Sequence, residues 1–141
     1  MNAEATARKY VDLFLKGDIA GFTALYAPTT SYRQAMTPAP LTTPQQVMEF
    51  ESGMFALFSD LAGEITWLVA DGDRVALGIR IQATHSGDMP TPDGGVIPAK
   101  GARITHEAAD YVRVDAEGRI VDHQRYQDIG SMVAQLKGGA G

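Results

Sequence analysis

The chain has 141 residues, of which 45% are hydrophobic and 21% are charged, and it contains no cysteine. This length fits one domain with an apolar core, and the lack of cysteine excludes disulfides and thiolate metal sites. Twelve basic and seventeen acidic residues give a formal net charge of −5 without a basic stripe, so nucleic acid is not an expected partner.

No run of about 18 apolar residues is present, so we expect no membrane-spanning segment and no membrane partner. The first ten residues mix acidic and basic side chains and lack the apolar core of a signal peptide, which favours a cytoplasmic protein. We expect a single domain over residues 1–137 and a disordered, glycine-rich tail over 138–141.

The first part of the sequence is typical of helices. Apolar residues recur at helical spacing between Glu4 and Lys16, and Asp18 is placed to cap a second, short helix. Extended structure is expected over 29–34. Pro44 begins a third, longer helix whose apolar stripe, with Phe55 among its members, continues to Phe58. This stripe provides an apolar wall suited to a hydrophobic ligand.

The second part of the sequence alternates with the period of two that is typical of strands. Turn residues join the expected strands into two hairpins, and a short helix closes the chain. The segment 87–101 holds three prolines and four glycines, too many for a regular element, and we expect a loop that covers a pocket mouth. The predicted strands are 64–70, 74–85, 103–114 and 119–127, and the closing helix is 129–136.

Helices followed by an antiparallel sheet predict a single-domain α+β cone, in which helices cover one face of a curved sheet around an internal cavity. The other face of such a sheet and its edges stay exposed. We therefore expect a homodimer, with Trp67 in the interface.

The run from Gly118 to Leu136 brings an acid, Asp128, to the point where a strand ends and a helix begins. If 119–127 is a strand, Gln124 and Tyr126 share a face with Asp128, and we expect that face to look into the pocket. A desolvated Asp128 has a raised pKa and can transfer protons, while Gln124 and Tyr126 bind substrate. The alternative is a helix N-cap, which lowers the pKa of this carboxyl.

Two histidines and a further acid are also candidates. His85 ends a strand beside the 87–101 loop, where it can orient a catalytic acid or simply be a structural histidine. His106 and Asp110 share one face of the next strand and are candidate substrate-binding residues, as is Phe55. Which face of that strand lines the cavity stays open, because one bulge inverts the assignment. No spacing demands a metal, so none is expected.

Several motifs of the second half resemble the SnoaL-like polyketide cyclases and predicted ester cyclases, within the nuclear-transport-factor-like and ketosteroid-isomerase-like superfamily. The resemblance covers nearly the whole chain in order of elements. Its motifs are Thr84-His85-Ser86-Gly87, Pro98-Ala99-Lys100-Gly101, Asp110-Tyr111-Val112-Arg113, Gly118-Arg119-Ile120-Val121-Asp122-His123, and Asp128-Ile129-Gly130 with Gln135-Leu136.

This resemblance implies an aspartate general acid/base at Asp128 for an intramolecular aldol closure without metal or organic cofactor, and it implies a dimer. The chain also departs from the family pattern. A tryptophan is usual where Gln124 stands, an arginine is common at Gly78, and Lys100 replaces a threonine or similar residue. These departures indicate a pocket with altered specificity.

We therefore expect a cofactor-independent enzyme that acts on a small, largely apolar carbonyl compound by cyclase, isomerase or lyase chemistry. Asp128 and His85 are its candidate catalytic residues. The alternative is a non-catalytic binding module or a dimeric scaffold of the same fold. A buried, uncapped Asp128 favours the enzyme, whereas an exposed Asp128 that caps the last helix favours the alternatives.

Overall fold

The computed structural model describes residues 1–91 and 93–138. Of the predicted tail 138–141, residues 139–141 lie outside the described residues. The helices are α1 (Ala3–Leu15), α2 (Ile19–Thr23), α3 (Pro44–Leu57) and α4 (Ile129–Leu136). The strands are β1 (Tyr32–Arg33), β2 (Phe58–Asp71), β3 (Arg74–His85), β4 (Met89–Pro90), β5 (Val96–Ile97), β6 (Arg103–Val114) and β7 (Ile120–Gln127).

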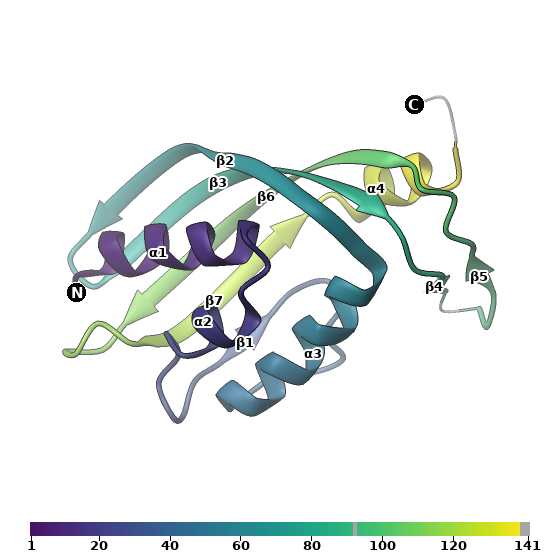
Figure 1. Ribbon diagram of the computed structural model, residues 1–141. Coiled ribbons are helices and arrows are strands. Elements are labelled where there is room, and N and C mark those ends of the chain that lie inside the picture. The colour runs from purple at the N-terminus through teal and green to yellow at the C-terminus, as the bar shows by residue number, and fades with distance from the viewer. Residues whose placement is uncertain (92, 139–141) are drawn as a thin grey trace.

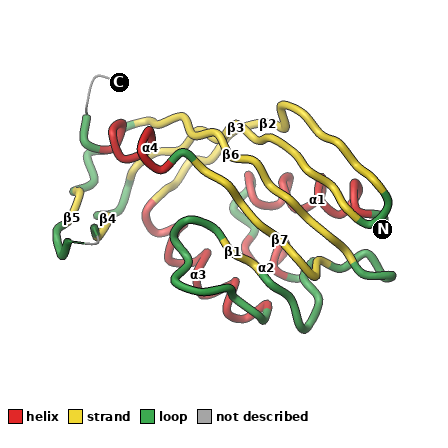
Figure 2. Tube along the Cα trace, turned by 180° about the vertical axis from the view of Figure 1, so that it is seen from behind, coloured by secondary structure: helices red, strands yellow, loops and turns green. Residues whose placement is uncertain are grey.

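Five strands form one curved sheet in the order β1-β7-β6-β3-β2, in which only the β1–β7 pair is parallel. Helix α1 lies along one face of this sheet, and α2 and α3 lie on the same side (Figure 1). Figure 2 shows the opposite face, over which the described part of the chain places no helix. The predicted α+β cone is confirmed. No helix of the described ranges is both long and apolar enough to cross a membrane.

Local sequence signals explain where the helices begin. Asp18 and Thr43 accept hydrogen bonds from the backbone N–H groups of Gly21 and Gln46, as N-caps of α2 and α3. Pro44 occupies the first turn of α3, where its missing N–H has no cost. Helix α3 runs directly into β2, so Phe58, predicted in the helix, is the first residue of the strand. The chain needs no loop there because Phe58 already has extended dihedral angles.

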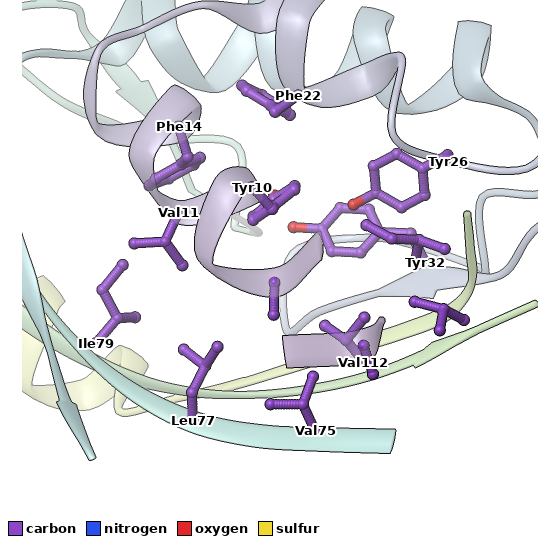
Figure 3. Close-up of a cluster of buried hydrophobic side chains, with 14 of the residues drawn as sticks. Tyr10, Val11, Phe14, Phe22, Tyr26, Tyr32, Val75, Leu77, Ile79 and Val112 are labelled. Atoms are coloured by element: carbon purple, nitrogen blue, oxygen red, sulfur yellow. The ribbon is translucent and has the colours of Figure 1, made fainter. Parts of the chain in front are cut away.

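The core lies between α1, α2 and the inner face of the sheet. Strand β3 alternates as predicted, with Val75, Leu77 and Ile79 each about 1% exposed. Figure 3 shows these side chains facing Tyr10, Val11 and Phe14 of α1, with Phe22 of α2 stacked above. The Tyr10 ring contacts the rings of Phe14, Phe22, Tyr26 and His123.

The segment 87–101 differs from its prediction as an irregular lid. Strands β4 and β5 pair within it, and Met89 and Ile97 are buried in a second apolar cluster. That cluster joins them to Met132 and Leu136 of α4, at the end of the sheet where Figure 1 places β4, β5 and α4. Strands β4 and β5 are held at this end because the side chains of Met89 and Ile97 are buried in that cluster.

Candidate functional site

An ion pair between Asp110 of β6 and Arg125 of β7 lies in the interior. The guanidinium Nε and Nη2 atoms donate to the two carboxylate oxygens, each at 2.9 Å, and both side chains are at most 3% exposed. Strand pairing sets this contact, since Asp110 and Arg125 are register partners. The Arg125 guanidinium also lies 4.7 Å above the ring of Phe14.

Electrostatics keep both members of this pair charged. Burial acts to raise the pKa of Asp110, but the Arg125 charge and the His123 hydrogen bond outweigh it and hold that pKa well below its ordinary value. Burial acts to lower the pKa of Arg125, but Asp110 raises it well above its ordinary value. The site therefore holds a permanent cation.

His123 and Tyr26 extend this pair into a directed chain. His123 Nε2 lies 2.9 Å from Asp110 Oδ2, and the Tyr26 hydroxyl lies 2.6 Å from His123 Nδ1. An ionised Asp110 only accepts, so Nε2 carries the imidazole proton and Nδ1 accepts from Tyr26. Burial lowers the pKa of His123, which fits this neutral form. Every oxygen of Asp110 is thereby hydrogen-bonded.

A second buried acid, Glu51, lies on α3 and is 2% exposed. The Tyr32 hydroxyl donates to its Oε1 atom at 3.0 Å, and Gln34 Nε2 donates to the Tyr32 hydroxyl at 2.7 Å. Burial raises the pKa of Glu51, and Arg125 and Tyr32 offset only part of that effect. Glu51 is thus a desolvated carboxyl that holds its proton to a higher pH than an ordinary glutamate does.

Glu51 and Arg125 line the same cavity. Its free volume is about 70 Å³, several times what one water molecule needs. Both groups keep a free end, because Glu51 Oε2 and Arg125 Nη1 have no hydrogen-bond partner within residues 1–91 and 93–138. The remaining lining residues are mostly apolar: Phe14, Gln34, Met54, Phe55, Phe58, Leu61, Ile81, Ala83, Ile104, His106, Gln127 and Met132.

His106 and Gln127 form the other polar part of the lining. Gln127 Nε2 lies 3.1 Å from His106 Nε2, so this imidazole nitrogen accepts. Burial, and then the charge of Arg125, lowers the pKa of His106 and keeps the ring neutral. His106 also borders an outer hollow that Thr105, Glu107, Asp128 and Ser131 line. The cavity thus offers one cation, one titratable acid and one neutral imidazole.

The prediction of which face of β7 points into the protein is wrong. His123 and Arg125 point into the protein, whereas Tyr126 is 60% exposed and Gln124 accepts from its hydroxyl on the outer face. Asp128 is exposed and caps α4, accepting from the backbone N–H of Ser131 at 3.0 Å. Its carboxylate therefore borders the outer hollow and does not line the cavity. Alternation set which residues share a face, but not which face is buried.

The other predicted residues lie mostly inside. Asp110, His106 and Phe55 belong to the ion pair or to the cavity wall, which settles the inner face of β6. His85 is fully buried beside the Phe58 ring, but both its ring nitrogens lack a hydrogen-bond partner in the described ranges and it does not line the cavity. The described residues contain no cluster of three or more histidine or acidic side chains placed to bind a metal ion.

Sequence reasoning missed Glu51, Arg125 and the tyrosine that binds Glu51. One signal was present for the acid: Glu51 lies four residues after Val47 and four before Phe55, inside the apolar stripe of α3. An acid at such a position is costly to bury and is often functional. Arg125 and Tyr32 had no comparable signal, because their burial depends on strand pairing.

The first prediction concerns the ion pair. Replacing Asp110 with Asn leaves the buried Arg125 charge unpaired, and we expect it to lower the free energy of unfolding by about 3–5 kcal/mol. Denaturant unfolding followed by circular dichroism measures this loss. Asp128→Asn is the matched control, since Asn also caps helices well and the exposed site should change by less than about 0.5 kcal/mol. Equal losses in both variants would contradict the assignment.

The second prediction concerns the pH dependence of stability. A carboxyl whose pKa is raised on folding adds stability below its unfolded-state pKa, and that stability is lost as the pH rises through the folded-state pKa. The Glu51→Gln variant does not show this loss of stability, because its amide does not titrate. We expect its melting temperature relative to wild type to rise by about 3 °C between pH 5 and pH 8. A difference independent of pH, measured by scanning calorimetry, would show that Glu51 does not titrate in this range.

Comparisons with known proteins agree with this architecture. A polyketide cyclase assigned provisionally in Xanthomonas campestris pv. campestris is 19% identical, with a TM-score of 0.81 over 95% of this chain and 96% of that one. IdmH of Streptomyces antibioticus, with the same provisional assignment, is 24% identical, with a TM-score of 0.77 over 96% and 99%. An epoxide hydrolase of M. tuberculosis, similar to the LEH type, is 15% identical, with a TM-score of 0.72 over 97% and 90%.

Sequence comparison with functionally curated proteins finds no match. The solved structures are too distant in sequence to carry more than the fold. The family model described as SnoaL-like polyketide cyclase matches residues 4–136, nearly the whole chain. This chain therefore belongs to the SnoaL-like polyketide cyclase family.

Proposed function

We propose that this protein is an acid/base enzyme for a small, largely apolar carbonyl compound, with Glu51 as the proton-transfer group and Arg125 as the oxyanion-binding group. The observation that carries the proposal is a buried carboxyl of raised pKa in the same apolar cavity as a fixed guanidinium. Polyketide cyclase chemistry in the family supports the same reaction class.

The reaction begins with the ionised Glu51. Its free Oε2 atom takes a proton from the carbon next to the substrate carbonyl, and the C–H electron pair forms the enolate double bond. The carbonyl oxygen gains the negative charge and accepts a hydrogen bond from Arg125 Nη1. Because water is largely excluded, this charge-assisted hydrogen bond is stronger than in solution.

Two outcomes complete the reaction. In a cyclisation, the enolate carbon attacks a second carbonyl of the same molecule, a C–C bond forms, and Glu51 returns its proton to the new alkoxide. In an isomerisation, Glu51 returns the proton to a different carbon. Both outcomes balance without an oxidant or reductant. The apolar wall, which includes Phe55 and Phe58, binds the substrate body.

A binding module of the same fold is the second candidate. The exposed Asp128, as the cap of α4, favours it, because the family's expected acid/base position does not reach the cavity. Here Glu51 and Arg125 hold a ligand carbonyl by hydrogen bonds alone. The two candidates differ in whether a bound ketone exchanges its α-protons with solvent.

The experiment is therefore α-proton exchange in D₂O, followed by NMR for a panel of small cyclic and acyclic ketones and diketones. We expect catalysed exchange for the wild type and a loss of at least about 100-fold in Glu51→Gln. Glu49→Gln is the matched control, since Glu49 is exposed on the same helix. Binding without exchange would support the module. Loss of exchange in Asp128→Asn instead of Glu51→Gln would return the role to Asp128.

We also propose that a second copy of the chain covers the outer sheet face. Trp67 and Tyr126 lie on that face at opposite ends of one cross-strand row, with Gly78 and Ala109 between them, and Val69 is 66% exposed nearby. Large apolar side chains exposed together on one sheet face are typical of an interface.

We expect the wild-type protein to sediment as a homodimer in a sedimentation-velocity experiment. Trp67→Lys should weaken the association at least about tenfold, because it would bury a charge at the interface. Val96→Lys is the control, since Val96 is 57% exposed on β5, away from this sheet. A wild-type monomer at micromolar concentration would contradict the proposal.

A further inference from the structure

Glu51 is the last member of a short hydrogen-bond chain that begins on β1. Tyr32 is fully buried, and the register partner of this strand residue is His123 of β7. Gln34 follows two residues later, and its carboxamide Nε2 lies 2.7 Å from the same phenol oxygen, which lies 3.0 Å from Glu51 Oε1. Tyr32 also packs against the His123 ring, with 4.7 Å between centroids, which fixes its orientation.

The chain has a direction. Burial raises the pKa of Tyr32 well above its ordinary value, and the Glu51 charge adds to this, so the phenol keeps its proton. Gln34 Nε2 donates to the phenol oxygen, and the single Tyr32 proton is then donated to Glu51 Oε1. Oε1 is therefore occupied as an acceptor, and Oε2 is the oxygen that remains for the substrate.

We propose that Tyr32 and Gln34 are positioning residues that fix the rotation of the Glu51 carboxyl and present its Oε2 atom to the substrate. This inference rests on the proposed function of Glu51, but it concerns residues that do not take up the reacting proton. It assigns a role to Tyr32 and Gln34, for which the sequence patterns predicted none.

The same hydrogen-bond chain also affects the pKa of Glu51, because it stabilises the charged form of this carboxyl. The Tyr32 bond favours the Glu51 carboxylate against the burial that disfavours it. Other titratable groups act on Glu51 through space, and in the described part of the chain none of them donates a hydrogen bond to it. These groups are Arg125 and Asp110. Burial raises the pKa of Tyr10 and of Tyr26, the Glu51 charge adds to this effect, and His106 lies on the same cavity wall.

The direct test needs no substrate. Carboxyl ¹³C NMR follows the titration of Glu51, whose signal is assigned by its loss in Glu51→Gln. We expect Tyr32→Phe to raise the midpoint by about one pH unit, because it removes one hydrogen bond to the ionised carboxyl. Gln34→Met should raise it by a smaller amount. Tyr111→Phe is the matched control, since Tyr111 is on the outer sheet face, and it should leave the midpoint unchanged.

Kinetics then separate positioning from a merely structural role. With a ketone that the wild type exchanges, Tyr32→Phe should leave KM nearly unchanged and lower kcat about tenfold on the plateau above its new midpoint, where Glu51 is ionised but no longer held in one rotation. A kcat that recovers fully above the new midpoint would overturn the positioning role, as would an unmoved NMR midpoint in both Tyr32→Phe and Gln34→Met. If Tyr32→Phe does not fold, Gln34→Met decides by its midpoint.

The two proposals can fail separately. Exchange that persists in Glu51→Gln removes the proposed function, whatever the midpoint does in the Tyr32 variant. A midpoint that does not move, with exchange lost in Glu51→Gln, removes only the positioning role.

Discussion

The buried pair of Asp110 and Arg125 is the interaction on which the rest of the site depends. Two charges in a water-excluded interior are tolerated only when they are paired and their remaining hydrogen-bonding atoms are satisfied. Asp110 receives donors from Arg125 and from His123, and His123 in turn receives one from Tyr26. This requirement joins β6, β7 and the segment that follows α2, with a free guanidinium edge toward the cavity.

The opposite wall of the cavity is built on the same principle. Glu51 enters the interior from α3, and its cost of burial is met partly by Tyr32 and partly by the charge of Arg125. Two hydrogen-bond chains, one that ends at a cation and one that ends at a carboxyl, therefore converge on one apolar space. Low polarity strengthens each contact that a substrate makes with them. The raised proton affinity of Glu51 is a consequence of this enclosure.

The family relationship and the local chemistry answer different questions. Membership and the solved structures support the cone fold, at sequence identities between 15 and 24% for the structures described above. Function depends on the side chains inside that cavity. Here the acid at the family position caps a helix, and the desolvated acid comes from α3. Under the proposed function, this cone carries its proton-transfer group on α3 and not at the end of β7.

The amino-acid sequence by itself determined the elements of this protein. Capping residues such as Asp18 and Thr43, the strand alternation of β3 and the two turns between long strands specify local structure through short-range sterics and hydrogen bonds. The α+β class and the kinship to a family followed from them. The sequence also predicted that His106 and Asp110 share one face of their strand, since a period of two is a local property.

Only the tertiary structure decided which faces are buried. A register irregularity lies between Arg113 and Val114, where β6 meets β7, so counting from the turn does not identify the inner face of either strand. The place of Glu51 in the apolar stripe of α3 indicated burial, but only the packing of the helix decided it. Arg125 had no such signal, because its burial depends on the pairing of β6 with β7. Burial and charge pairing join residues that are far apart in sequence, and local patterns carry no information about such contacts.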